Sequence, residues 1–188
     1  ALIAAPVAEA RAIEPLGAPH PRIASPRALF PDRANSAGLD LTDERRLATL
    51  AEALAAATAT PLHAEPLVTG RASQVGEARE MLSPADQRDR VGACVDAGPE
   101  AIAAALAAAE AAQPAWGAVP PAERAAALLR AAALMESRMD ELIGPIVREA
   151  GKTLPNGIGE VREAVDFLRY YATEAAAAEK GTSARGVI

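Results

Sequence analysis

The chain has 188 residues, a formal net charge of −6 and an isoelectric point near 5.0. An acidic chain without a basic stripe is a poor candidate for contact with nucleic acid, and no uncharged apolar run reaches the length of a membrane span. Hydrophobic residues make up 51% of the sequence but aromatic residues only 3%, so its alanine-rich helices each bury little apolar area. The composition therefore predicts packed helices without a deep independent core.

Both ends of the sequence suggest a piece of a longer protein. The chain starts at Ala1 without an initiator methionine, and it stops at ARGVI, an apolar run of the kind that begins a strand. We therefore expect further chain on both sides, and we expect no signal peptide to be visible in such a piece.

Prolines recur through the first part of the chain, at positions 6, 15, 19, 21, 26 and 31. Proline interrupts helices because it lacks a backbone N–H, so this spacing predicts helix breaks after Pro15 and an extended connector to about Arg33. The stretch NSAGLDLTDE follows, with turn residues and with Thr42 as a candidate N-cap. Leucines at positions 47, 50 and 54 keep helical spacing, which predicts a helix from Thr42 to about Thr58.

The middle of the chain carries the signals of loops and strands. Residues 60–86 contain three prolines and two glycines without a sustained period, which predicts a loop with a short strand over Pro66–Thr69. The run RVGACVDA predicts a strand over Arg90–Asp96. Pro99 suits the first position of a helix that runs to about Gln113, and Trp116 closes that unit.

Three further helices are predicted in the last part of the chain. Pro120 and Pro121 open the first, and Asp140 begins the second, which we expect to be interrupted near residues 144–145. Gly151 is a candidate C-cap because a helix often ends in a left-handed residue. The last helix is predicted over Gly157–Ala178.

The tripeptide Gly151-Lys152-Thr153 looks like the end of a phosphate-binding loop. That loop needs G-x-x-x-x-G-K-[ST] between a strand and a helix. Here Ile146 stands where the first glycine is required, and a predicted helix precedes the motif. The tripeptide therefore indicates a helix stop, not a nucleotide site.

Cysteine and histidine offer no recognisable catalytic or metal-binding pattern. The single Cys94 lies in the predicted strand without a histidine close in sequence, so we interpret it as a structural buried cysteine. One cysteine excludes an internal disulfide and is typical of a reducing cytoplasm. His20 and His63 lie in proline-rich connectors without the spacing of metal ligands, and we expect both at the surface.

A helical projection at about 100° per residue separates two sides of the last predicted helix. One side is apolar, and its members are Val161, Ala164, Val165, Leu168 and Ala172. Another side carries Arg162, Asp166 and Arg169, a row of opposite charges that predicts a solvated face.

Glu163 belongs to neither side of this helix. It shares its direction with Phe167 and Tyr170, at i+4 and i+7, and its neighbours at i−3 and i+3 are acidic. No basic residue of this helix therefore pairs with Glu163. Such a carboxylate is solvated, paired from another element, or part of a site.

Two long stretches of the sequence carry a set of landmarks in a fixed order. They are RVGACVDAGPEAIAAALAAAEAAQPAWGAVPPAERAAALLRAAALME and IVREAGKTLPNGIGEVREAVDFLRYYA, with the landmarks Trp116, Arg124, Glu149-Ala150-Gly151-Lys152, Glu160-Val161 and Tyr171-Ala172 in order. Together these stretches resemble the opening of the aldehyde dehydrogenase superfamily. The upstream PHPRIASPRALF and NSAGLDLTDE resemble the segment that joins the two catalytic domains of the bifunctional proline utilization A family.

The resemblance implies an α/β fold with a Rossmann-type NAD-binding domain, of which this portion is mostly α-helical with a proline-rich linker. It implies residues 1–41 as interdomain linker, 42–60 as a linker helix, 61–86 as a loop, and 87–188 as the first part of the NAD-binding domain. The parent would oxidise proline with FAD to pyrroline-5-carboxylate, which hydrolyses to glutamate semialdehyde, and would then oxidise that aldehyde to glutamate with NAD.

For the site, the resemblance implies that Glu163 lines the aldehyde pocket, as a glutamate does in the branch that acts on glutamate semialdehyde. The family's Pro-Trp-Asn-Phe segment, nucleophilic cysteine, general-base glutamate and main cofactor loops are missing from this sequence. No catalytic, cofactor-binding or metal-binding residue is therefore expected, and the 188 residues alone are expected to be inactive.

The resemblance further implies small-molecule substrates, contact with the rest of the parent chain, a homo-oligomer, and a cytoplasmic parent that meets the inner membrane through quinone reduction. The alternative is a stand-alone helical interaction or scaffolding module, favoured by the alanine-rich helices and the missing catalytic set. The coding sequence beyond Ile188 distinguishes the two, because only the enzyme requires a catalytic cysteine domain there.

Overall fold

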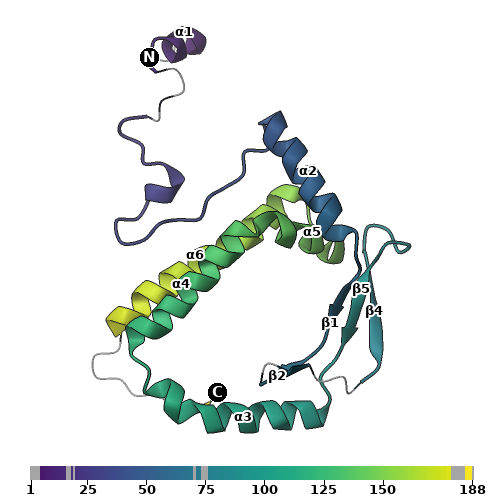
Figure 1. The fold of residues 1–188 in the computed structure, drawn as a ribbon. Coiled ribbons are helices and arrows are strands. Elements are labelled where there is room, and N and C mark those ends of the chain that lie inside the picture. Colours follow the sequence, from purple (N-terminus) through teal and green to yellow (C-terminus); the bar gives the residue numbers. More distant parts are fainter. Residues whose placement is uncertain are drawn as a thin grey trace.

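The computed structural model describes residues 5–15, 18, 20–69, 71–72, 76–178 and 185–187. Helices and a small sheet follow one another around an open ring, and the irregular N-terminal segment extends outside it (Figure 1). Helices α4 (Pro121–Ser137) and α6 (Leu154–Ala178) pack along each other on one side. Helix α2 (Glu44–Thr58) lies against α5 (Met139–Ala150), and α3 (Pro99–Gly117) runs apart from them beyond the sheet. Within the described residues, no helix combines the length and the apolar character needed to cross a membrane.

The N-terminal segment contains little regular structure before α2. Among its described residues the elements are α1 (Pro6–Arg11) and the short 3-10 helix η1 (Pro26–Ala28), and α2 covers Glu44–Thr58. The predicted N-cap Thr42 is wrong by one residue, because the Asp43 carboxylate accepts the backbone N–H of Arg45 at 3.0 Å. The Thr42 hydroxyl donates instead to Asp40, at 2.7 Å.

The sheet joins strands that are distant in sequence. Its members are β1 (Leu62–Ala64), β5 (Arg90–Val95) and β4 (Ala78–Leu82), in that spatial order. β1 pairs with β5 in parallel, β4 pairs with β5 antiparallel, and β2 (Leu67–Val68) forms a separate antiparallel pair with β3 (Arg71–Ala72). The strands predicted near residues 66–69 and 90–96 are confirmed.

The prediction of a loop over residues 61–86 is wrong in its secondary structure. Three-residue β1 and five-residue β4 carry no period that a local pattern could show, and both are held by hydrogen bonds to β5. Gly92 permits the close approach of β1, since a Cβ there would lie 2.2 Å from the Leu62 carbonyl oxygen.

Four helices follow β5 in the described residues, and their bounds are α3 (Pro99–Gly117), α4 (Pro121–Ser137), α5 (Met139–Ala150) and α6 (Leu154–Ala178). α3 continues past the predicted end at Gln113. α6 begins at Leu154 and not at Gly157, because Thr153 binds the first turn through its carbonyl oxygen, which accepts from Gly157 N at 2.9 Å. Gly151 has φ +63°, so the predicted left-handed helix stop is confirmed.

The predicted interruption of α5 near residues 144–145 does not occur. Gly144 is buried against α2, and a Cβ there would lie 3.1 Å from Thr58 Cγ2. The glycine therefore serves close packing between two helices. Pro145 lies inside the helix, which continues to Ala150.

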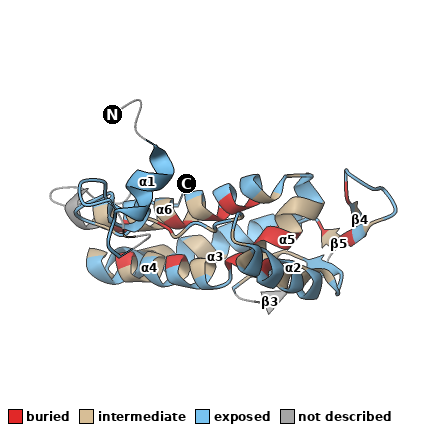
Figure 2. Ribbon diagram, turned by 90° about the horizontal axis from the view of Figure 1, so that it is seen from above, coloured by how far each residue is buried: buried red, intermediate tan, exposed pale blue. Residues whose placement is uncertain are grey.

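The hydrophobic core lies between α2, α4, α5 and α6. Its buried members are Leu50, Ala132, Met139, Ile143, Ile158, Val161 and Val165. The apolar side predicted for α6 is confirmed, since Val161, Val165 and Ala172 are buried. Buried residues in Figure 2 gather along these helices, whereas Ala101 is the single buried residue of α3.

Candidate functional site

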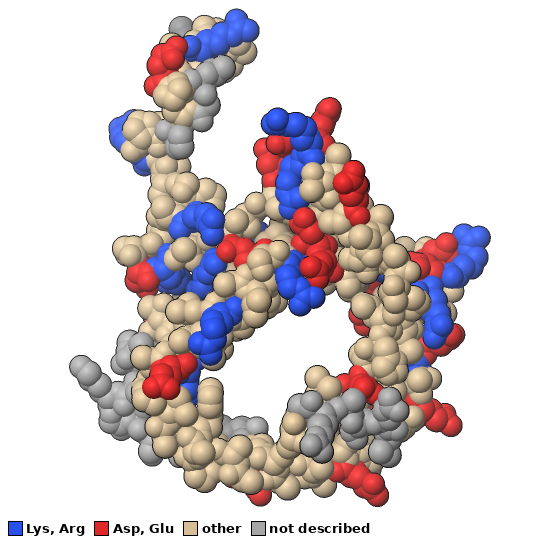
Figure 3. Space-filling model, in the orientation of Figure 1, with Lys and Arg blue, Asp and Glu red and all other residues tan. Residues whose placement is uncertain are grey.

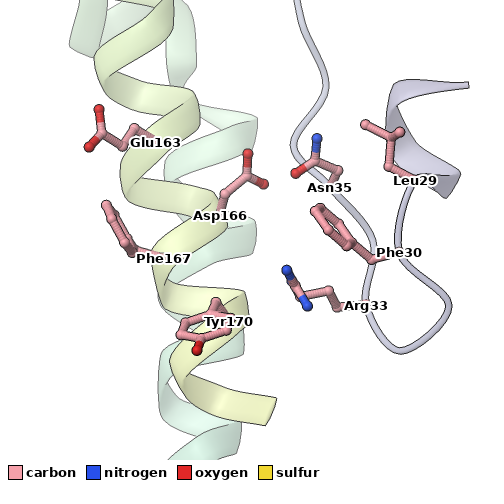
Figure 4. A pocket seen from close by; sticks show the side chains of 8 residues that line it. All are labelled: Leu29, Phe30, Arg33, Asn35, Glu163, Asp166, Phe167 and Tyr170. Carbon is pink, nitrogen blue, oxygen red and sulfur yellow. The ribbon is translucent and has the colours of Figure 1, made fainter. Parts of the chain in front are cut away.

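A pocket of about 470 Å³ lies between the N-terminal connector and α6. The connector contributes one wall and α6 the other, and the residues that line it are Leu29, Phe30, Arg33, Asn35, Glu163, Asp166, Phe167 and Tyr170 (Figure 4). The two walls are more than a hundred residues apart in sequence, so the pocket exists only because the connector folds back on α6.

Glu163 lies at this pocket on the side that the helical projection assigned to it. Phe167 and Tyr170 line the same pocket, which confirms that the three residues share one side of α6. The Glu163 carboxylate is exposed and points away from the connector wall (Figure 4). No other residue in the described part of the chain forms a hydrogen bond or an ion pair with it.

Three aromatic side chains follow Glu163 on α6. The rings of Phe167 and Tyr171 stack with their centroids 5.9 Å apart, and Tyr170 meets Tyr171 edge to face at 5.2 Å. Phe167 remains half exposed. A carboxylate that has no partner among the described residues and lies beside exposed aromatic side chains suits a small ligand that carries a positive charge.

The prediction that Arg162, Asp166 and Arg169 form a solvated face is wrong. Arg162 Nε donates to Ser36 Oγ at 3.3 Å, and Asp166 accepts both the backbone N–H and the hydroxyl of Ser36, at 2.6 and 2.8 Å. Arg169 pairs with Glu136 of α4 at 2.7 Å. The row of charges is covered by the connector and by α4, which a projection of α6 alone cannot show.

Glu136 connects three parts of the chain. Its carboxylate accepts the backbone N–H of Ala37 at 2.7 Å, pairs with Arg169 and lies 3.4 Å from Arg27. The hydrogen-bonded Arg169 guanidinium lowers the pKa of Glu136 more than burial raises it, and the Ala37 N–H lowers it further. The carboxylate therefore stays ionised in the folded protein at neutral pH.

Arg33 reaches from the connector into the pocket. Its guanidinium lies 3.9 Å from the Phe30 ring centroid and 5.2 Å from that of Tyr170, within the range of cation–π attraction. Sequence reasoning did not identify Arg33, Asn35 or Ser36 as site residues. The turn chemistry of NSAG was the available signal, but it does not say which helix the turn contacts.

The other candidate residues stay outside this pocket. Cys94 lies in the predicted strand, but it is half-buried and not buried, with its Sγ 3.9 Å from Asp96 Oδ1. His20 and His63 are exposed, as expected. Among the described residues no group of three His, Cys, Asp or Glu side chains could hold a metal ion.

The Gly151-Lys152-Thr153 tripeptide ends α5, and Lys152 forms an ion pair with Glu160 of α6. On the face shown in Figure 3, basic and acidic side chains are interspersed, without a continuous basic stripe. The end of α5 at the tripeptide agrees with the prediction of a helix stop. The interspersed charges agree with the lack of a basic stripe in the sequence.

Comparison with known proteins relates this chain to dehydrogenases. The model of the aldehyde dehydrogenase family matches residues 71–186. The bifunctional protein PutA of Escherichia coli (strain K12) is 51% identical over 157 residues, which are 83% of this chain and 12% of that protein. The chain thus spans about an eighth of the length of this relative.

Solved structures agree in fold. Proline utilization A from Bdellovibrio bacteriovorus, inactivated by N-propargylglycine, superposes with a TM-score of 0.77 at 29% identity, covering 84% of this chain and 17% of that one. A 1-pyrroline-5-carboxylate dehydrogenase from Thermus with bound NAD gives a TM-score of 0.74 at 31% identity, covering 86% of this chain and 31% of that one. The predicted α/β, aldehyde dehydrogenase-like fold is confirmed.

Proposed function

The chain belongs to the aldehyde dehydrogenase family, and from this premise we propose that it is part of a bifunctional enzyme that oxidises proline to glutamate. The observation that carries the proposal is the 51% identity to a bifunctional PutA protein over 83% of the chain. That match is about forty residues longer than the 71–186 region of the family model, so it includes part of the connector as well as the dehydrogenase region.

In this proposal, residues 1–41 belong to the interdomain linker, 42–60 form a linker helix, and 87–188 begin the NAD-binding domain. FAD would serve the proline dehydrogenase domain, and NAD would accept the hydride from the aldehyde substrate. The nucleophilic cysteine, the general base and the oxyanion donor would come from other parts of the parent. The homo-oligomer, the cytoplasmic location and the membrane contact through quinone reduction remain predictions for the parent.

Within this function, Glu163 recognises the amino group of glutamate semialdehyde. The substrate carries a protonated amino group at neutral pH, and a carboxylate within hydrogen-bond reach orients it by a charge-assisted contact. The Glu163 carboxylate is exposed at the pocket and has no partner among the residues that the structure describes, which supports this role. The half-exposed Phe167 beside it offers apolar contact to the carbon chain of the substrate.

The test compares Glu163→Gln with Glu174→Gln in the full-length parent, since both glutamates are exposed on α6 and Glu174 lies outside the pocket. A charge-assisted hydrogen bond contributes about 1.5–3 kcal/mol, so Glu163→Gln should lower kcat/KM for glutamate semialdehyde about ten- to hundredfold. Oxidation of propanal, which lacks the amino group, and the KM for NAD should stay near the wild-type values.

Equal losses with both aldehydes in a variant that keeps its fold would mean that Glu163 supports the structure and does not recognise the substrate. A parent that oxidises propanal but not glutamate semialdehyde would refute the proposed function itself. The stand-alone interaction module is not favoured, because the 51% identity to an enzyme covers most of the chain.

A further inference from the structure

The connector forms half of the pocket, although it contains almost no regular secondary structure there. Residues 29–37, here called the connector wall, contribute Leu29, Phe30, Arg33 and Asn35 to the lining. Helical hydrogen bonds do not hold a segment of this kind, so its position depends on contacts with the helices beside it.

Asp166 of α6 provides the main polar contact of the connector wall. Ser36 is fully buried, and its backbone N–H and hydroxyl donate to the two different carboxylate oxygens of Asp166. The Asn35 amide, oriented with its nitrogen toward α6, donates to both oxygens of the same carboxylate at 2.9 Å. The Ser36 hydroxyl also accepts from Arg162. Asp166 thus holds two consecutive residues of the wall.

Two further contacts hold the connector wall, one on each side of Asn35 and Ser36 in sequence. Ala37 donates its backbone N–H to Glu136 of α4, whose charge is balanced by Arg169 of α6. Before Asn35, the Arg33 guanidinium lies over the Phe30 ring of the wall and over the Tyr170 ring of α6. The connector wall is therefore held to the helices by three sets of contacts, made by Arg33, by Asn35 and Ser36 with Asp166, and by Ala37.

Asp166 and Glu163 lie about one helical turn apart, but their side chains point in different directions (Figure 4). Asp166 faces the connector, and both of its carboxylate oxygens accept hydrogen bonds from Ser36 and Asn35. Glu163 has no partner in the described residues. The connector wall and Glu163 line the same pocket, and in the described structure no residue of the wall bonds the Glu163 carboxylate. The two residues can therefore be separated by experiment.

We propose that Asp166 is a positioning residue, which holds the connector wall against α6 and so shapes the pocket in which Glu163 recognises the aldehyde substrate. This inference rests on the proposed function. It makes the connector a part of the substrate pocket as well as a link between domains.

The experiment uses the full-length parent with Asp166→Asn, and with Asp140→Asn as matched control. Asp140 forms a 2.7 Å ion pair with Arg46 that joins α5 to α2 outside the pocket, and its side chain is 26% exposed. Limited trypsin digestion measures how readily the connector wall detaches from the helices, because trypsin cleaves after Arg33 within the wall and after Arg27 next to it. We expect cleavage there to be about tenfold faster in Asp166→Asn and unchanged in Asp140→Asn.

Kinetics then test the effect of the wall on substrate recognition. Asp166→Asn should raise the KM for glutamate semialdehyde about tenfold, with kcat and the KM for NAD within about twofold of wild type. Adding Glu163→Gln to Asp166→Asn should raise this KM by less than the product of the single effects, because both act on one contact. Adding Glu163→Gln to Asp140→Asn should raise the KM for glutamate semialdehyde by the full product of the two single effects.

Trypsin resistance equal to wild type in Asp166→Asn would overturn the inference, and so would faster cleavage with an unchanged KM for glutamate semialdehyde. The proposed function stands in both cases as long as Glu163→Gln keeps its selective effect. If Asp166→Asn does not fold, Ser36→Ala removes both hydrogen bonds of the Ser36 hydroxyl, the one to Asp166 and the one from Arg162, and keeps the backbone donor to Asp166. The same readouts then apply with smaller shifts.

Discussion

Ile143 offers a direct test of the helical core that supports α6. Its side chain is fully buried in the cluster between α2, α4, α5 and α6. Its Cγ2 would lie 3.3 Å from a Cβ at Gly157, so the isoleucine fills the space that this glycine leaves open on α6. Ile143→Ala removes three carbons from this contact.

The expected cost follows from the transfer of those carbons and from the cavity that they leave. At about 0.8 kcal/mol per carbon the transfer part is about 2.4 kcal/mol, and the cavity brings the total to about 3–4 kcal/mol. Ile143→Val removes one carbon and should cost about 1 kcal/mol. Leu134→Ala, at a side chain that is 62% exposed, should cost less than about 0.5 kcal/mol.

Hydrogen exchange of the α5 and α6 amides in the full-length parent measures these costs locally, which suits a protein of several domains. Because 1.4 kcal/mol corresponds to a factor of ten, Ile143→Ala should accelerate exchange in both helices about a hundredfold or more. Acceleration no larger than that of Leu134→Ala would refute the assignment of Ile143 to the core, as would an effect confined to α5.

Three further predictions concern single positions. Gly151→Ala should destabilise the α5–α6 corner by about 2 kcal/mol, seen as faster exchange, because Gly151 has φ +63° and a Cβ there would lie 2.8 Å from Pro84 Cγ. The lowered pKa of Glu136 means that its contribution to stability is complete above its ordinary pKa of 4.5 and is lost as the pH falls through the lowered value. Urea unfolding between pH 7 and pH 3 should therefore show a smaller loss of stability in Glu136→Gln than in wild type, and an equal loss would contradict the pairing with Arg169. Cys94→Ala should leave turnover nearly unchanged and cost about 1 kcal/mol or less, and loss of activity in a folded variant that binds NAD would contradict its structural role.

Local patterns predicted the helices well where the chain carries strong local signals. The helix that begins at Pro121, the strand at residues 90–95 and the stop at Gly151 lie where proline, β-branched residues and glycine indicated them. The apolar side of α6 and the shared side of Glu163, Phe167 and Tyr170 followed from helical geometry alone. One wall of the pocket was therefore predictable from the sequence.

The other wall was not predictable, because it belongs to a segment without a period. Nothing local to Phe30, Arg33 or Asn35 indicates α6 as their partner, more than a hundred residues away. The same reason explains the error over residues 61–86, where β1 and β4 are too short to show an alternation and exist through pairing with β5.

Sequence alone thus determined which side of α6 is apolar, which side is charged and which side carries Glu163, because those properties depend only on the turn of the helix. Tertiary structure alone decided what lies against each side. Arg162, Asp166 and Arg169 have the charges of a solvated row, yet Ser36 and Glu136 cover them. The sequence does not show whether water or a buried backbone N–H forms the hydrogen bonds of a charged side chain. Only the folded chain places the Ser36 backbone nitrogen 2.6 Å from Asp166 Oδ1.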